Sequence, residues 1–189
     1  ILVIILKMQD QFTTMPSLTT SKKDISTKSN GLKWKIYCDM DGVLVNFNKR
    51  FGELSAWGPE KFIDKNGLDE FWELIDSRGV GFWVGMDWMD DGKELFNILK
   101  ENFEVELLSS PSRAESSRLG KRLWVRNHKL GVKLNLEYSR SKHKHAAPNH
   151  ILIDDREDII KDWESKGGVG ILHTSTENTI KCLRKKGIL

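Results

Sequence analysis

The sequence predicts an α/β fold in which a parallel sheet carries helices on both faces. Short apolar runs that end in turn-forming or polar residues are typical of buried strands, and five occur, at residues 33–38, 105–108, 133–137, 151–153 and 169–172. Segments with helical spacing of apolar residues lie between or after them, at 93–100, 113–129, 156–166 and 176–186. Strands that alternate with helices of this length indicate a parallel sheet with helical crossovers.

Composition is that of an ordinary globular domain. The 189 residues are 39% hydrophobic and 30% charged, enough for one core with a small inserted subdomain. A net charge of +3 does not by itself indicate nucleic-acid binding, and it suits a small anionic substrate. Cys38 and Cys182 lie far apart and form no disulfide pattern, so a reducing, cytoplasmic setting is expected.

Residues 1–31 are expected to form a flexible extension, because residues 12–31 are rich in Ser, Thr and Lys. The apolar run at residues 1–6 is much shorter than the roughly 20 residues that span a bilayer. Neither a signal peptide nor membrane association is therefore expected.

Polar side chains follow three of the predicted strands. In a parallel α/β sheet, ligands bind beyond the carboxyl ends of the strands, so these residues should meet at one edge. A basic stretch, which includes Lys144, precedes the last of them. The residues at the strand ends are Asp39, Asp41, Ser109, Ser110, Asp154 and Asp155.

The pair Asp39 and Asp41 has the spacing that places two carboxylates on the same side of an extended segment. One can attack phosphorus while the other handles the proton of the leaving oxygen. Two carboxylates facing a phosphate repel it, and a hard cation such as Mg²⁺ removes that conflict. The alternative is an acidic surface turn, since Asp-Gly is a common turn dipeptide.

Each of the other candidates also has a functional and a structural interpretation. Asp154 and Asp155 can bind metal or cap the following helix. Ser109 can bind phosphate oxygens or form a turn. Lys144 can neutralise charge on a phosphoryl group or lie in a solvated basic loop.

Taken together and in this order, these motifs resemble those of the haloacid-dehalogenase-like phosphatases over residues 34–173. The resemblance implies that Asp39 is a nucleophile that becomes an aspartyl-phosphate and that Asp41 is the general acid and base. It implies Mg²⁺ as cofactor, held by Asp39, the backbone carbonyl of Asp41 and Asp154, with Asp155 acting through water. It also implies that Ser109, Ser110 and Lys144 hold the phosphate.

Within that superfamily, the chain is similar to the 5'(3')-deoxyribonucleotidases, which are related to the cytosolic type C 5'-nucleotidases. The similarity rests on residues 39–47, 109–111 and 153–156, and on Lys121, which resembles a phosphate-binding lysine of that branch. The chain differs in having Ser109 where that branch has Thr, and Asp87 and Asp90 where it has prolines.

The segment at residues 48–90 is too long for a simple crossover and is predicted to be a helical cap inserted into a core of residues 32–47 and 91–189. Its aromatic residues can form the cap's own core or stack on a nucleobase. Phe47 and Trp83 are the residues expected to contact the substrate.

The function expected from the sequence is Mg²⁺-dependent hydrolysis of a nucleoside monophosphate, most of all a deoxyribonucleotide. The alternatives are a phosphatase for another small phosphate ester or for a nucleic-acid 3'-phosphate, and a non-catalytic nucleotide-binding module. Nucleic acid is not the expected partner, and a homodimer is compatible with the sequence.

Overall fold

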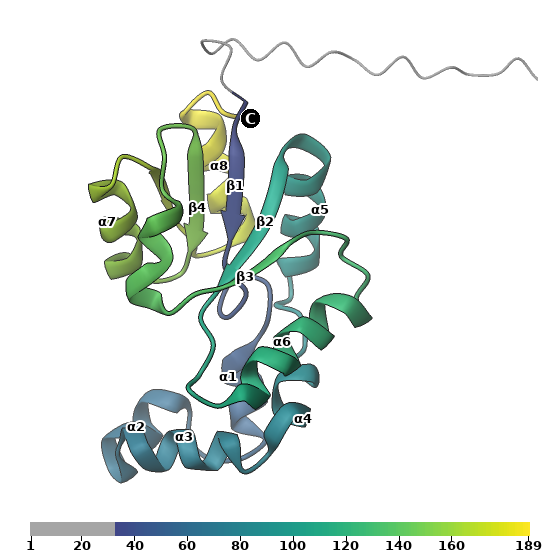
Figure 1. The fold of residues 1–189 in the computed structure, drawn as a ribbon, viewed down its shortest axis with the longest axis vertical. Coiled ribbons are helices and arrows are strands. Elements are labelled where there is room, and N and C mark those ends of the chain that lie inside the picture. The colour runs from purple at the N-terminus through teal and green to yellow at the C-terminus, as the bar shows by residue number, and fades with distance from the viewer. Residues whose placement is uncertain (1–32) are drawn as a thin grey trace, which may run out of the picture.

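The computed structural model describes residues 33–189, so the extension predicted for residues 1–31 lies outside the described residues. Five parallel strands form one sheet in the order β3-β2-β1-β4-β5 (Figure 1). All five predicted strands are confirmed. Their bounds are β1 (Lys35–Cys38), β2 (Glu104–Ser109), β3 (Leu134–Leu136), β4 (His150–Asp154) and β5 (Val169–Leu172).

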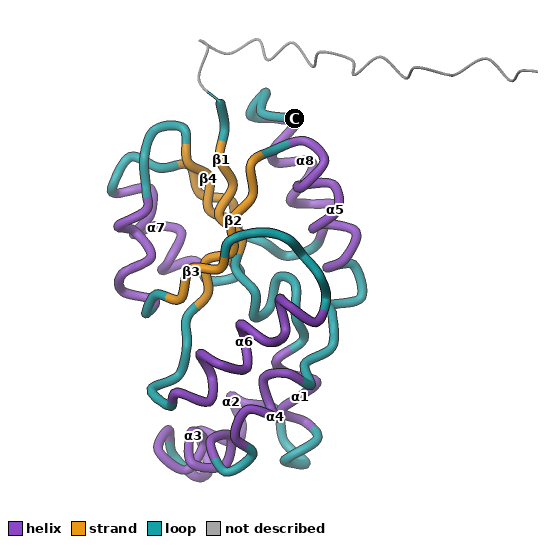
Figure 2. Tube along the Cα trace, turned by 45° about the vertical axis from the view of Figure 1, so that its right-hand side comes forward, coloured by secondary structure: helices purple, strands orange, loops and turns teal. Residues whose placement is uncertain are grey.

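Helices cover both faces of this sheet, as predicted. Figure 2 shows α7 on one side of the strands and α5 and α8 on the other. The basic stretch before β4 forms a 3₁₀ helix. The bounds are α5 (Gly92–Asn102), α6 (Glu115–Asn127), η2 (Ser139–His145), α7 (Glu157–Ser165) and α8 (Thr176–Lys185).

Alternation along β1 shows how the sheet divides the core. Ile36 and Cys38 pack into the larger apolar cluster, which includes residues of α5 and α8. Tyr37 packs into the smaller cluster, together with Ile159 and Trp163 of α7. Because successive strand residues point to opposite faces, Asp39, two residues after Tyr37, points to the α7 side as Tyr37 does.

The segment predicted as a cap forms four helices, α1 (Phe47–Gly52), α2 (Pro59–Asn66), α3 (Leu68–Asp76) and α4 (Gly79–Val84). They lie together beyond the lower end of the sheet in Figure 1. The two connections to the core run side by side: the backbone N–H of Asn46 donates to Asp87 O at 2.8 Å, and that of Met89 donates to Leu44 O at 2.8 Å. The inserted unit is thus attached by a pair of hydrogen-bonded linkers.

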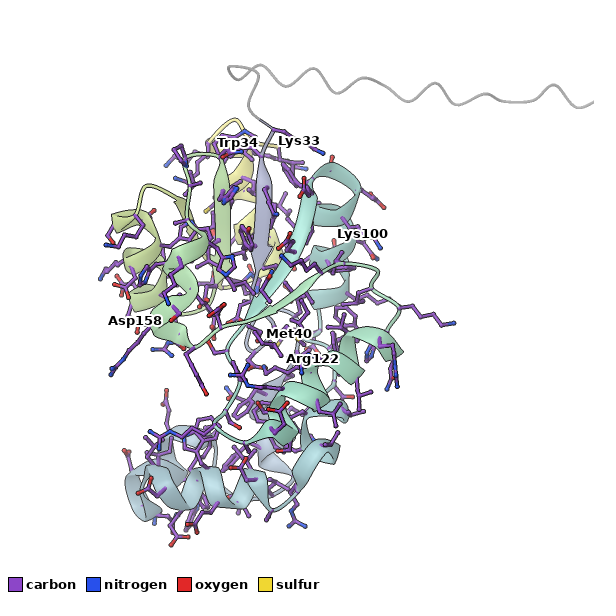
Figure 3. The ribbon with its side chains drawn as sticks, in the orientation of Figure 1. Lys33, Trp34, Met40, Lys100, Arg122 and Asp158 are labelled. Atoms are coloured by element: carbon purple, nitrogen blue, oxygen red, sulfur yellow. The ribbon has the colours of Figure 1, made fainter. Side chains whose placement is uncertain are left out.

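Helix α4 packs directly on α6, which positions the inserted helices over the sheet end. Gly120 permits this contact, since a Cβ there would lie 2.3 Å from the Cβ of Trp83. The indole of Trp124 on α6 also donates to Met86 O at 2.8 Å. Figure 3 shows Met40 at the sheet end that faces these helices, opposite the end at Trp34.

Candidate active site

The tight turn after β1 positions Asp39 beside the end of β4. Asp39 is still held in the sheet, because its N–H donates to Ile153 O at 2.9 Å. The chain then tightens, with Met40 O accepting three successive backbone N–H groups at 2.8–3.2 Å. Two features require glycine at position 42. Its φ is +75°, which residues with a side chain rarely adopt, and a Cβ there would lie 2.1 Å from Oδ2 of Asp155.

Asp39, Asp154 and Asp155 form a cluster in which one carboxylate oxygen from each lies within 4.8 Å of the others. Burial and the neighbouring charge of Asp39 raise the pKa of Asp154 to about 6. Asp155 is partly open to solvent, yet burial of its carboxyl group and the charges of Asp39 and Asp154 raise its pKa to about 7. A divalent cation that prefers oxygen ligands fits this donor set and would relieve the repulsion.

Lys142 joins two members of this cluster. Its ammonium nitrogen lies 2.8 Å from Oδ2 of Asp39 and 2.7 Å from Oδ2 of Asp154, and its side chain is 2% exposed. Burial by itself would lower the pKa of Lys142, but the two carboxylates outweigh it and raise the pKa. Lys142 therefore remains a cation next to Asp39.

Lys144, the lysine expected to hold the phosphate, is exposed and does not line the cavity, and Lys142 lies beside Asp39 instead. The reason is the geometry of η2, which has three residues per turn and so aligns residues 139, 142 and 145 on one face. Ser139 lines the cavity and His145 packs against the ring of Tyr37, with centroids 5.3 Å apart. Lys144 lies on a different face of η2.

Asp41 has a separate environment formed by Lys121. The ammonium of Lys121 lies 2.5 Å from Oδ2 of Asp41 and donates to Oγ of Ser109 at 3.0 Å. Burial raises the pKa of Asp41, the positive charge of Lys121 opposes the rise, and the net direction is upward. The other carboxylate oxygen of Asp41, Oδ1, is buried without a hydrogen-bond partner among the described residues. A carboxyl group in this state can carry a proton.

Ser109 and Lys121 are fully buried behind Asp41 and do not line the cavity. Ser110 does line it, and its Oγ lies 3.0 Å from Oγ of Ser139. Of the predicted phosphate ligands, only Ser110 therefore reaches the cavity, while Ser109 and Lys121 contact Asp41 or each other.

A cavity of about 460 Å³ extends from the carboxylates to the inserted helices. Phe47 and Trp83, the residues expected to contact the substrate, line it, but Trp83 is only 1% exposed, and its indole N–H is buried with no partner among the described residues. The remaining cavity residues were not identified from the sequence, because only the packing of the cap on the core brings them together. On the cap side they include aromatic and apolar residues together with two amides, and on the core side they are mostly polar: Asn46, Asn48, Phe71, Trp72, Met89, Ser112, Ser139, Arg156 and Ile159.

The chain is similar to known proteins in sequence and in fold, although no family model matches it. A curated protein of Vibrio phage KVP40, named "Putative 5'(3')-deoxyribonucleotidase", is 34% identical over 122 residues, or 64% of this chain. That match spans 65% of the phage protein, just under two thirds of its length.

Two solved structures share the architecture. A HAD-superfamily hydrolase from Geobacter sulfurreducens superimposes with a TM-score of 0.54 at 13% identity, covering 80% of this chain and 96% of that one. A hydrolase from Streptococcus pneumoniae superimposes with a TM-score of 0.51 at 12% identity, covering 81% of this chain and 100% of that one. The chain has a haloacid-dehalogenase-like fold. This fold confirms the predicted architecture, and among the described residues no helix has the length and apolar character needed to cross a membrane.

Proposed function

We propose that this protein is a Mg²⁺-dependent phosphatase that hydrolyses nucleoside monophosphates, with deoxyribonucleotides as the preferred class. The observation that carries the proposal is the position of Asp39. It lies on the floor of the cavity beside Lys142 and two further carboxylates, opposite a wall of aromatic side chains. That combination provides a nucleophile, a place for a phosphoryl group and a surface for a base.

In the first chemical step, a carboxylate oxygen of Asp39 forms a bond to phosphorus while the bond from phosphorus to the ester oxygen breaks. Asp41 gives its proton to that leaving oxygen, and the alcohol departs. A water molecule then attacks phosphorus and gives its proton to Asp41, and inorganic phosphate leaves as Asp39 is regenerated. The raised pKa of Asp41 and its unpartnered Oδ1 suit this exchange of a proton.

Mg²⁺ bound by Asp39, Asp154 and Asp155 would supply positive charge against the phosphoryl oxygens. The chain itself contributes the ammonium of Lys142, which is fixed by Asp39 and Asp154 and cannot turn away. Ser110, on the cavity wall, offers a hydroxyl to a phosphate oxygen. These groups concentrate the favourable interactions where charge gathers during transfer.

The substrate class follows from the opposite wall. Phe47 and Trp72, both half-buried, present aromatic surface at the cavity in front of the buried Phe71 and Trp83, and every nucleobase has a face that stacks on such rings. A cavity of about 460 Å³ lies within the usual range for small-molecule sites, roughly 300–1,000 Å³. The name of the phage relative points to the same class of substrate.

The test is phosphate release from a panel of deoxyribonucleoside and ribonucleoside monophosphates, glycerol phosphate and a 3'-phosphorylated oligonucleotide, each with Mg²⁺ or with chelator. Asp39→Asn runs in parallel. We expect Mg²⁺-dependent release that is fastest with deoxyribonucleotides and absent in the variant. Release only from glycerol phosphate or the oligonucleotide would retain the phosphatase and reject the nucleotide substrate. Folded protein that releases phosphate from nothing in the panel would reject both.

A further inference from the structure

Strand β3 forms one edge of the sheet and leaves part of its backbone without a partner. On its inner side, Lys133 O accepts from Leu107 N at 2.8 Å and Glu137 N donates to Ser109 O at 3.1 Å. Since backbone groups alternate in direction along a strand, those of Leu134 and Leu136 point to the outer edge. Within residues 33–189, neither leucine has an outer backbone hydrogen bond. Such an edge is a template for pairing with another strand.

The residues around this edge read Lys-Leu-Asn-Leu-Glu at 133–137, with opposite charges at the two ends. If two copies pair antiparallel about Asn135, Lys133 of each copy lies opposite Glu137 of the other. Leu134 then lies opposite Leu136, in the type of pair that exchanges two backbone hydrogen bonds. We propose that β3 pairs with β3 of a second copy of this chain, forming a two-fold symmetric dimer with a continuous ten-stranded sheet, that is, twice the five strands of one copy.

In this register every outer backbone group of Leu134 and Leu136 forms a hydrogen bond. Leu134 of each copy pairs with Leu136 of the other copy, because the two copies are related by a two-fold axis. It also divides the side chains by face. The leucines lie on one face, where Leu134 already packs against the larger core cluster. Lys133, Asn135 and Glu137 lie on the other face. The dimer would therefore pair apolar with apolar and cation with anion.

The charged residues are available for this pairing. The Lys133 side chain is 67% exposed and the Glu137 side chain 41% exposed, and their contacts within one chain are long, at 3.4 Å to Glu106 and 3.9 Å to His145. Tyr138, 50% exposed, comes directly after this segment and would meet Val132 of the second copy in the same register. A second copy thus covers more of an aromatic ring that is half exposed in one chain, where Arg118 contacts it.

The opposite edge of the sheet does not offer the same match. Strand β5 has the sequence Val-Gly-Ile-Leu, with no charges to set an antiparallel register. A single short strand buries little area, so the expected dimer is weak and dissociates in the micromolar range. The self-complementary charges therefore select a second copy over an unrelated strand.

Sedimentation equilibrium of the full chain tests this pairing with a charge swap. We expect wild-type protein to dimerise, and Lys133→Glu or Glu137→Lys to weaken the dimer about tenfold or more, since each change makes two symmetric pairs repulsive. The double variant carrying both changes should recover the wild-type dissociation constant. Recovery separates the pairing from any effect of Lys133→Glu on Glu106, because the double variant keeps that effect.

Three outcomes would overturn the proposal. Wild-type protein could remain monomeric at concentrations well above the micromolar range. It could dimerise without responding to either single charge reversal. The single variants could dissociate and the double variant fail to recover while its melting temperature matches that of the single variants. Each result would place the dimer elsewhere or exclude it.

Discussion

The ammonium nitrogen of Lys142 lies 2.8 Å from Oδ2 of Asp39, the carboxylate at the end of β1. Because β1 and η2 are far apart in sequence, this contact exists only in the folded chain. It gives Asp39 a fixed cationic neighbour while Met40 N donates to the other oxygen at 2.7 Å. Contacts to both oxygens therefore hold the Asp39 carboxylate in one orientation at the edge of the cavity.

The pair Lys142 and Lys144 offers a direct test of that relationship. Lys142→Met should lower kcat by about 100-fold or more, because a fixed charge next to the transferring group is lost. Lys144→Met should change kcat by no more than about twofold, since Lys144 is exposed. Steady-state kinetics on both variants, with circular dichroism to confirm folding, shows which of the two lysines acts on the phosphoryl group. The reverse pattern would favour Lys144 as the phosphate-binding lysine, as the family resemblance implies.

Divalent metal should stabilise the fold through the three carboxylates. Mg²⁺ at about 100 times its dissociation constant is expected to add about 2.7 kcal/mol to the free energy of unfolding. Asp154→Asn should abolish this gain, while Asp158→Asn, whose partner is the exposed Arg156, should retain it. Thermal melting with and without Mg²⁺ measures the effect independently of catalysis. An equal gain in both variants would move the metal away from this cluster.

Gly42→Ala should impair both stability and metal binding. The positive φ of +75° costs about 1 kcal/mol for a residue with a side chain, and the new Cβ would displace Asp155. Gly167→Ala is the matched control, with φ of +84° and open space around the position. Urea unfolding should show losses in both variants, whereas Mg²⁺ titration should show weakened binding only in Gly42→Ala. Unchanged binding there would mean that Asp155 moves freely.

Trp72 should contribute to nucleotide binding through stacking. Trp72→Ala is expected to raise KM for a deoxyribonucleotide by about 5- to 150-fold, as the loss of about 1–3 kcal/mol per stacked base implies. KM for glycerol phosphate should hardly change, because that ester has no aromatic ring. Trp57→Ala is the control, since Trp57 is exposed on the cap and does not line the cavity. Equal losses for both substrates would indicate a structural role for Trp72.

Glu106 should make stability depend on pH. Burial would raise its pKa, but hydrogen bonds from Lys35 and Asn135 outweigh it and lower the pKa to about 2. Its stabilisation is therefore complete above its ordinary pKa of 4.5 and is lost as pH falls from there toward 2.

Glu106→Gln should consequently cost about 1–2 kcal/mol at pH 7 and progressively less below pH 4.5. Glu104→Gln, at a half-exposed position that also pairs with Lys35, should cost less than about 0.5 kcal/mol. Urea unfolding at several pH values between 7 and 3.5 measures both. A gap between wild type and Glu106→Gln that stays constant over this range would contradict the assigned cause.

The strands, helices and strand-end acids could be predicted because each depends on local patterns. The apolar run before Asp39 and the one before Asp154 identify buried strands, and parallel strands that are neighbours in a sheet must present their carboxyl ends at one edge. Lys142 could not be distinguished from Lys144 in this way, since the two differ only in their position on a 3₁₀ turn. Neither could the pairing of Lys121 with Asp41, 80 residues away.

The sequence by itself thus determined the α/β architecture, the inserted segment and the identity of the acids, because hydrophobic periodicity and turn chemistry act over a few residues. Only the tertiary structure decided which lysine reaches Asp39, which serine reaches the cavity, and which aromatic side chains face the carboxylates. Those choices depend on how α4 packs against α6 and how η2 turns above β1. Contacts between distant segments are set by side-chain shape and close packing, and a linear pattern does not record them.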